Sequence, residues 1–329
     1  MKNFINEDKI FDILKKTQSP SCKSVETIIN KSLTLRGLSP EEAAVLLNCD
    51  EKASLNRIFE TAKQIKETIY GNRLVLFAPL YLSNRCVNNC LYCGFSKENK
   101  NSDTRHLDTN EIREETRALI SQGHKRLLIV SAENPAVNID YIENAIETVY
   151  NTKEGNGDIR RVNINVAPMG VEDFKKLKQT GIGTYQLFQE TYHRDTYSQL
   201  HTSGPKSDYL KRLYACDIAQ SAGIDDVGIG ALFGLYDYKF EILALLFHTL
   251  HLEEVFGVGP HTISVPRLEQ AEGSNIASTP PYPVSDADLK KIISVLRLAV
   301  PYTGIILSTR ENAALRNELI YLGVSQISA

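Results

Sequence analysis

The sequence predicts an α/β fold, a TIM-type (β/α)8 barrel with an N-terminal helical extension. From residue 74 onward, eight short apolar runs rich in β-branched residues alternate with segments of helical periodicity, which is typical of βα units and a parallel sheet. Eight βα units close a barrel of roughly 250 residues. The chain of 329 residues therefore divides into a helical extension over residues 1–70 and a barrel over residues 71–329.

The N-terminal extension carries helix start signals and helical spacing. Ser39, Pro40 and Glu42 form a capping box with proline at the first helical position. Further on, apolar residues from Ile58 to Ile69 recur at helical intervals. We expect these helices to close the bottom of the barrel, and we assign no chemistry to them.

The barrel elements follow in order along the chain. The eight expected strands cover residues 74–82, 126–131, 161–167, 184–189, 226–232, 261–265, 303–307 and 324–327. The expected helices between them include residues 109–122, 139–150, 208–222, 240–251 and 285–298. Functional groups in such barrels gather at the C-terminal ends of the strands, so each candidate is judged by whether it follows a strand.

Composition narrows the classes of function. The hydrophobic content of 42% supplies a sizeable core, and 37 basic against 40 acidic residues give a net charge of −3, which provides no electrostatic footprint for nucleic acid or an anionic membrane. No apolar run approaches the roughly 20 residues of a membrane span. With no signal peptide and only six cysteines, we expect a cytoplasmic protein with reduced thiols.

Three of the cysteines lie close together directly after the first expected strand. Cys86, Cys90 and Cys93 have the spacing C-x3-C-x2-C, whereas the other cysteines stand alone in the sequence. A cube of four irons needs four ligands, so three thiolates leave one iron open to a substrate or cofactor. The alternatives are buried apolar cysteines, a disulfide with a spare thiol, or a zinc site completed by His106 or His124.

Acidic and amide side chains follow the next strands. Glu133 comes after the second strand, and Asn163 and Asn165 share one face of the third, where ligand contact competes with simple packing inside the barrel. Glu190 ends the fourth strand within a polar cluster, and a buried glutamate needs a partner that a ligand would supply. Gly228 and Gly230 follow in the fifth strand. They indicate either a close approach of the backbone to a ligand or positions where only a small residue fits inside the barrel.

Basic residues end two of the later strands. Arg267 and Arg310 are each suited to binding a carboxylate through two parallel hydrogen bonds, or to forming a salt bridge at the rim with Glu269 or Glu311. His261 is a lone histidine, and such residues are more often structural than metal-binding.

The cysteine motif resembles that of the radical S-adenosylmethionine superfamily, in which an aromatic residue precedes the third cysteine, as Tyr92 does here. The resemblance implies a [4Fe-4S] cluster whose open iron binds S-adenosylmethionine and cleaves it to a 5′-deoxyadenosyl radical. After the second strand, Glu133 matches the acidic member of the family's Gly-Gly-Glu turn, while Ala132 replaces a glycine.

Over nearly its whole length the chain is similar to the tyrosine lyases of FeFe-hydrogenase maturation (HydG type), and less closely to the 2-iminoacetate synthases of the thiamine pathway (ThiH type). The segment Pro260-His261-Thr262 favours the hydrogenase branch. The matching segments cover residues 77–81, 86–90, 181–185, 189–193, 228–239, 259–267, 308–311 and 325–329.

This resemblance implies cleavage of L-tyrosine to p-cresol and dehydroglycine, with an external one-electron reductant of the flavodoxin or ferredoxin type. The three cysteines would hold the cluster, and Tyr92, Glu133, Glu190 and Asn165 would bind the cofactor. Arg310, with Ser308 or Arg267, would bind the tyrosine carboxylate. His261 would face a second iron site.

The chain departs from the family pattern at its end. It stops at Ala329, at the close of the eighth expected strand, and it contains no second C-x2-C motif for an auxiliary cluster. We therefore expect a barrel truncated before its last helix, with one side of the sheet poorly covered, that cleaves tyrosine without making carbon monoxide or cyanide. The remaining alternatives are a thiamine-pathway enzyme and an incomplete fragment that only binds an iron-sulfur cluster.

Overall fold

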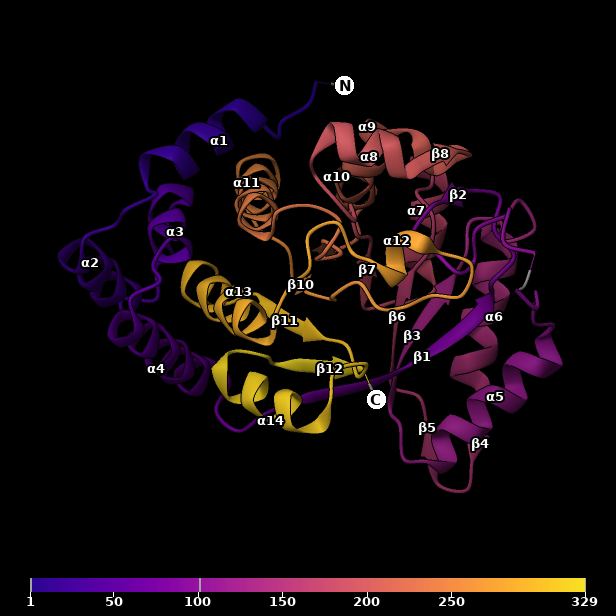
Figure 1. Cartoon of the computed structure of the whole chain (residues 1–329). Coiled ribbons are helices and arrows are strands. Elements are labelled where there is room, and N and C mark those ends of the chain that lie inside the picture. Colours follow the sequence, from indigo (N-terminus) through magenta and orange to yellow (C-terminus); the bar gives the residue numbers. More distant parts are fainter. Residues whose placement is uncertain (1, 101, 329) are drawn as a thin grey trace.

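A computed structural model describes residues 2–100 and 102–328 as a closed barrel of parallel strands surrounded by helices (Figure 1). The predicted (β/α)8 fold is confirmed, and the last residue of the predicted barrel region, Ala329, lies outside the described residues. Around the barrel the strands follow the order β1-β12-β11-β10-β9-β7-β6-β3. Their bounds are β1 (Val75–Ser83), β3 (Arg126–Ser131), β6 (Arg161–Asn165), β7 (Thr184–Gln186), β9 (Asp226–Gly230), β10 (Thr262–Ser264), β11 (Gly304–Leu307) and β12 (Gln326–Ser328).

Helices lie between the strands on the outside of the barrel. Their starts follow local capping: Asp108 caps α5 and Ser285 caps α13, each within a capping box. The helices are α5 (Thr109–Ser121), α6 (Ile139–Asn151), α7 (Val171–Gln179), α10 (Ala215–Ser221), α11 (Tyr238–Phe256), α13 (Asp286–Ala299) and α14 (Ala313–Leu322). The single helix expected over residues 208–222 is instead two, α9 (Tyr209–Leu213) and α10, because Tyr214 between them leaves helical geometry.

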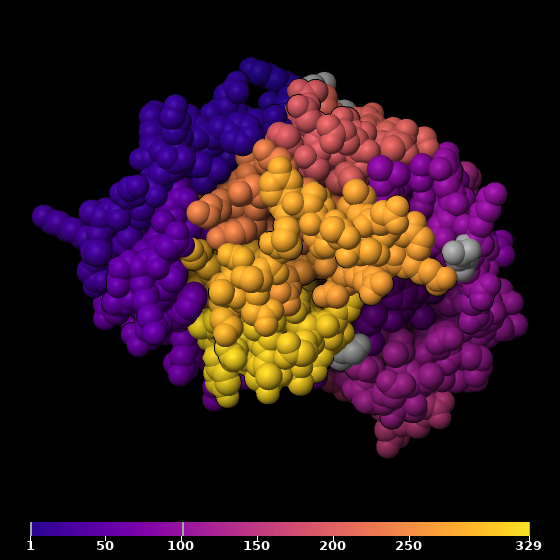
Figure 2. Space-filling view, viewed as in Figure 1, coloured from indigo at the N-terminus to yellow at the C-terminus, as the bar shows by residue number. Residues whose placement is uncertain are grey.

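Short elements complete the connections at both ends of the barrel. Two small antiparallel pairs are formed by β2 (Asn89–Cys90) with β8 (His201–Ser203) and by β4 (Lys153–Glu154) with β5 (Gly157–Asp158). The remaining short helices are α8 (Arg194–Leu200), a 3-10 turn (Pro205–Ser207) and α12 (Asn275–Ser278). In the space-filling view, the orange segment after β10 covers the middle of the face shown (Figure 2).

The N-terminal helices form an arc around one side of the barrel (Figure 1). They are α1 (Glu7–Lys16), α2 (Cys22–Ser32), α3 (Pro40–Leu47) and α4 (Lys52–Tyr70), and they pack against α11 and α13. The predicted capping box is present, with the Ser39 amide donating to Glu42 Oε2 over 2.8 Å. These helices thus add an outer layer beside the barrel, where we had expected them to close its bottom.

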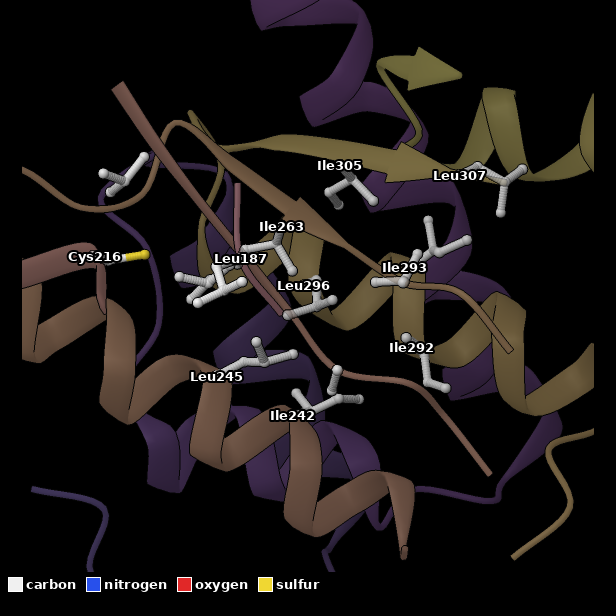
Figure 3. Close-up of a cluster of buried hydrophobic side chains, with 14 of the residues drawn as sticks. Leu187, Cys216, Ile242, Leu245, Ile263, Ile292, Ile293, Leu296, Ile305 and Leu307 are labelled. Carbon is white, nitrogen blue, oxygen red and sulfur yellow. The ribbon is translucent and has the colours of Figure 1, made fainter. Parts of the chain in front are cut away.

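The main core lies between the sheet and the outer helices. Strand residues alternate between two faces, so Ile263 and Ile305 point outward while their neighbours Thr262 and Ser264 point inward. The outward residues are fully buried against α11, which contributes Ile242 and Leu245, and against α13, which contributes Ile292, Ile293 and Leu296 (Figure 3). This outer packing fixes the strands, and it leaves the inner face of the barrel free for polar side chains.

The outer face of the sheet is unevenly covered where β1 meets β12. Leu76 on β1 is 53% exposed, whereas Ile327 beside it in register on β12 is only 7% exposed. The expected gap in the helical layer is therefore present at Leu76 but not at Ile327. Among the described residues, no helix combines the length and apolar character that crossing a membrane requires.

Candidate active site at the C-terminal end of the barrel

A cavity of about 350 Å³ opens at the C-terminal ends of the barrel strands. Its wall includes Cys93 from the cysteine loop, Glu190 after β7, and Ser308 and Arg310 after β11. Because parallel strands bring their carboxyl ends to the same edge, residues far apart in sequence meet here. The cavity therefore collects most of the site residues predicted from the sequence.

The three cysteines lie on one loop that follows β1. Cys90 is part of β2, which pairs with β8, so the loop is attached to the segment after α8. Two backbone amides donate to the sulfurs, Asn88 N to Cys86 Sγ and Phe95 N to Cys93 Sγ, each over 3.4 Å. Such donors stabilise thiolate ligands in iron-sulfur proteins.

Burial disfavours the thiolate form of two of the cysteines, because it raises the pKa of both Cys90 and Cys93. Burial raises the pKa of Cys90 to about 11, although Lys206 acts in the opposite direction. A bound metal replaces the thiol proton, because thiolates are the ligating form. No disulfide joins these cysteines, which excludes the disulfide alternative in this structure.

The cysteine loop offers three thiol side chains, which is the donor set of a cube with one open iron. Within the described part of the chain, no three His, Cys, Asp or Glu side chains converge on one metal position. His106 stacks on Tyr141 at 4.6 Å, and neither it nor His124 lines the cavity.

Asn88 links the cysteine loop to the turn that contains Glu133. Its side-chain amide donates to Glu133 Oε2 over 2.8 Å, and its Oδ1 accepts from the Lys206 amide over 2.8 Å. The backbone adds a bond from Val87 N to the Glu133 carbonyl at 2.9 Å. Glu133 does not line the main cavity. It lines a second pocket of about 490 Å³, together with other residues of the connection between β3 and α6.

Glu190 is held between two cations in a strained backbone conformation. Its φ angle is 72°, a left-handed value that few residues other than glycine adopt. Lys206 Nζ lies 2.7 Å and Arg212 Nη2 lies 3.3 Å from Glu190 Oε1. Burial raises the pKa of Glu190, but the two cations outweigh it and lower the pKa overall, so this carboxylate is ionised.

Tyr92 is fixed beneath the Lys206 ammonium. The ammonium lies 5.6 Å from the centre of the Tyr92 ring. Burial lowers the pKa of His201 to about 3, and its Nδ1 donates to the Tyr197 carbonyl, which leaves Nε2 to accept from the Tyr92 hydroxyl at 2.8 Å. Lys206, Arg212 and His201 were not predicted from the sequence, because none of them follows a barrel strand.

The two candidate arginines have different surroundings. Arg310 lines the cavity and is exposed, and within the described residues its side chain donates only to Ser308 Oγ, over 3.3 Å. Arg267 forms a two-pronged ion pair with Glu311 and donates to Asp286 and the Val284 carbonyl, each over 2.9 Å. Arg267 is therefore used in the rim salt bridge that was the alternative interpretation, and it is not available to a ligand.

His261 lies at the opposite end of the barrel from the cysteines. It precedes β10, its amide donates to the Val227 carbonyl, and its ring nitrogen is 3.6 Å from Asp226. The structure therefore does not bring His261 into the cavity. A second iron site at this residue stays a prediction, and it would lie away from the cysteine loop.

The two predicted asparagines differ in whether they line the cavity. Asn165 lines the cavity, whereas Asn163 Oδ1 accepts from the Thr184 amide at 3.0 Å and has a packing role. Gly228 and Gly230 lie where no larger side chain fits. An added Cβ at Gly228 would lie 2.9 Å from Gln186 Cγ, and one at Gly230 would lie 2.8 Å from the Phe188 ring. The glycines accordingly make room for the neighbouring strand's side chains.

Comparisons with known proteins give one consistent result. The radical SAM superfamily profile matches residues 80–247, and the "Biotin and Thiamin Synthesis associated domain" matches residues 264–329. The chain is 30% identical to 2-iminoacetate synthase of Escherichia coli (strain K12), over 97% of this chain and 81% of that protein. It is 26% identical to the [FeFe] hydrogenase maturase subunit HydE of Thermotoga maritima, over 70% of this chain and 64% of that one.

Solved structures show a closer likeness. A crystal structure of HydG, described as a maturase of the [FeFe]-hydrogenase, superimposes with a TM-score of 0.97 and 55% identity, over 100% of this chain and 72% of that one. HydG from Carboxydothermus hydrogenoformans gives a TM-score of 0.91 and 45% identity, over 98% of this chain and 74% of that one.

Proposed function

The chain belongs to the radical SAM superfamily, and from this we propose that it cleaves the Cα–Cβ bond of L-tyrosine to p-cresol and dehydroglycine (2-iminoacetate). One observation carries the proposal. The cavity combines a three-cysteine loop on one side with a free arginine, Arg310, on the other, in a chain that is 55% identical over its whole length to a HydG maturase. We assign it to the HydG type, in maturation of the hydrogenase H-cluster.

The cofactor side of the cavity is formed by the cysteine loop and the segments attached to it. Cys86, Cys90 and Cys93 would hold a [4Fe-4S] cluster, with amide donors already directed at two of the sulfurs. When bound there, the cluster and S-adenosylmethionine would together supply a 5′-deoxyadenosyl radical able to abstract hydrogen. Glu133 and Glu190 would bind the charged groups of the cofactor, and Tyr92 and Asn165 would contact it from the cavity wall.

The Glu190 cluster has the charge required for this role. Lys206 and Arg212 surround one carboxylate, so the three side chains carry one net positive charge. An anionic carboxylate of a ligand would balance this excess in a nearly dry environment, where charge pairing is strong.

The substrate side is formed by Ser308 and Arg310. Arg310 has a guanidinium free to form two parallel hydrogen bonds with an amino-acid carboxylate, and the Ser308 hydroxyl lies next to it. This arrangement orients the substrate with its carboxylate at the rim and its side chain directed into the barrel. Water is excluded there by the apolar wall that includes Phe77, Leu128 and Ile306.

A thiamine-pathway 2-iminoacetate synthase is the second candidate, because the Escherichia coli synthase matches 97% of this chain. Both candidates share the tyrosine cleavage and need an external one-electron reductant of the flavodoxin or ferredoxin type. They differ in the fate of dehydroglycine after it leaves the cavity.

The test is an anaerobic assay after cluster reconstitution, with S-adenosylmethionine, L-tyrosine and a reductant. We expect 5′-deoxyadenosine and p-cresol in equal amounts, measured by chromatography. A variant with all three cysteines replaced by alanine is the control and should give neither. A brown protein that yields no 5′-deoxyadenosine would indicate an iron-sulfur scaffold, and a colourless protein rich in zinc would indicate a closed zinc site; either result contradicts the proposal.

A further inference from the structure

Two polar side chains in the inner wall of the cavity each have a buried atom without a hydrogen-bond partner within the described residues. Gln186 on β7 is 1% exposed and Ser264 on β10 is 4% exposed, and both line the cavity. Gln186 Nε2 and Ser264 Oγ are both left unpaired. Buried polar atoms are nearly always hydrogen-bonded in folded proteins, so this pair indicates a missing partner that a ligand would supply.

The surroundings of these two atoms are apolar. Phe77, Leu128 and Ile306 line the same inner part of the cavity. A wholly aliphatic ligand would leave Gln186 and Ser264 unpaired, and a strongly polar ligand would be desolvated against the apolar wall. An aromatic ring that carries one hydroxyl group satisfies both surfaces.

The depth of Ser264 matches the length of such a ligand. Ser264 is in register with Ile306 on β11, and Ile306 lies two residues before Ser308, which follows that strand. Two residues of strand correspond to about 6–7 Å, which is the span between Cα and the hydroxyl of tyrosine. An amino acid bound by Ser308 and Arg310 would therefore place a para substituent at the level of Ser264.

The local sequence keeps Gln186 in this position. An added Cβ at Gly228 on the neighbouring strand would lie 2.9 Å from Gln186 Cγ and 2.4 Å from Thr262 Oγ1. Glycine at this position thus lets the Gln186 side chain pass across β9 inside the barrel. Thr262 Oγ1 is also unpaired, but Thr262 does not line the cavity.

We propose that Gln186 and Ser264 form a hydroxyl-recognition subsite that selects a para-hydroxylated aromatic ring over an unsubstituted phenyl ring. The phenol oxygen accepts a hydrogen bond from Gln186 Nε2, and the phenol O–H donates a hydrogen bond to Ser264 Oγ. The identity of the ligand as tyrosine rests on the proposed function. A site built to bind a hydroxyl rejects the analogue that lacks it, by as much as about 10⁴-fold, because its own polar groups then stay unpaired.

The experiment measures binding to the reconstituted full chain with S-adenosylmethionine and no reductant, so that no turnover occurs. Calorimetry gives the affinities for L-tyrosine and L-phenylalanine in the wild type and in Gln186→Leu and Ser264→Ala. We expect the wild type to prefer tyrosine, and each variant to reduce that preference by about 10- to 100-fold. Phenylalanine affinity should stay the same or rise.

Thr262→Val is the matched control, because it removes an unpaired hydroxyl outside the cavity and should leave the preference unchanged. Ser264→Ala removes a single atom, so it tests the proposal even if Gln186→Leu does not fold. An unchanged preference in both variants would overturn the subsite. Equal weakening of both amino acids would overturn it too, because the residues would then act only through cavity shape.

A second ligand pair separates this proposal from the proposed function. The same variants are titrated with p-cresol and toluene, which lack the amino-acid group. A wild type that forms no p-cresol from tyrosine but still prefers p-cresol to toluene through Gln186 and Ser264 would refute the lyase and support the subsite. A wild type without that preference would overturn the subsite whatever the outcome of the tyrosine assay.

Discussion

Individual charged residues in the site differ in whether their charge is already paired. Glu190 is bound by Lys206 and Arg212, and Arg267 is bound by Glu311. Arg310 is exposed and has no acidic partner among the described residues. A ligand carboxylate therefore gains most at Arg310, where no existing ion pair has to be broken.

The contrast between the two arginines gives the first prediction. Arg310→Gln should raise the KM for tyrosine by about 10- to 100-fold, because it removes charge-assisted hydrogen bonds to the substrate. Cleavage of S-adenosylmethionine in the absence of tyrosine should be unaffected. Steady-state p-cresol formation measures the first effect, and 5′-deoxyadenosine release measures the second.

Arg267→Gln is the matched control for this prediction. It leaves Glu311, which is only 5% exposed, without its partner and should lower the free energy of unfolding by about 3 kcal/mol. The KM of the folded fraction should not change. If Arg267→Gln raised the KM as much as Arg310→Gln, the distinction between a substrate-binding and a structural arginine would be wrong.

The sequence alone identified some of these residues and missed others for a physical reason. The spacing of Cys86, Cys90 and Cys93 is local, so it is visible in the chain itself. Arg267 and Arg310 both follow strands, and the distinction between them depends on the folded position of Glu311. Lys206 was missed, because its role depends on a distant ion pair. Gln186 was identified only as part of the polar cluster that ends the fourth strand, because its own position depends on neighbouring strands.

At the scale of elements, the cysteine loop depends on a second loop for its shape. β2 pairs with β8, and directly after β8 Gly204 packs against the cysteine loop. Gly204 has φ 93°, and an added Cβ would lie 2.4 Å from Asn88 Oδ1 and 2.8 Å from Asn88 Cα. The close approach lets Lys206 reach both Asn88 and Glu190.

This contact gives the second prediction. Gly204→Ala should lower the free energy of unfolding by about 2–4 kcal/mol, because backbone strain adds to a clash with Asn88. It should also reduce the iron bound per chain after reconstitution. Urea unfolding and iron analysis measure the two effects.

Gly257→Ala provides the comparison, since Gly257 ends α11 with φ 75° and an added Cβ there meets nothing within 4 Å. It should cost about 1 kcal/mol, from backbone strain alone, and leave iron binding intact. Equal losses in the two variants would show that the Asn88 contact contributes nothing.

The elements themselves were predicted where the hydrophobic period was clear. All eight strands of the barrel were expected within a few residues of their observed bounds, because each is an apolar run facing the outer helices. α7 and α14 were not predicted; only Phe174 and Leu177 of α7, and Leu315 and Leu319 of α14, are buried. Such a narrow buried face leaves a weak periodic signal.

At the scale of the whole molecule, the N-terminal helical layer supports the segment that follows Glu190. Glu7 accepts from the Arg194 amide at 2.7 Å, which attaches α1 to the start of α8. Beneath this contact, Thr191 Oγ1 and the Tyr192 amide both donate to the buried carboxyl of Glu241 on α11. The strained site residue thus rests on contacts contributed by two regions distant in sequence.

Buried titratable groups in this support make stability depend on pH. Burial lowers the pKa of His201 and of His248 to about 3, so the unfolded chain binds more protons than the folded chain up to pH 6.5. Stability therefore rises with pH over that range. Burial raises the pKa of Glu241 to about 8. Between pH 4.5 and 8 the folded chain therefore holds a proton that the unfolded chain has released. The contribution of Glu241 to the free energy of unfolding accordingly falls as the pH rises over this range.

The opposing signs predict a stability maximum near pH 6.5, followed by a fall of about 2 kcal/mol up to pH 8, as Glu241 loses its proton in a dry site. Urea unfolding of the full chain at intervals of pH measures this curve. Glu241→Gln should abolish the fall, because its amide still accepts from Tyr192 N and donates to Thr191 Oγ1 but does not titrate. A wild type and a Gln variant with parallel curves between pH 6.5 and 8 would show that Glu241 is already ionised in the folded chain.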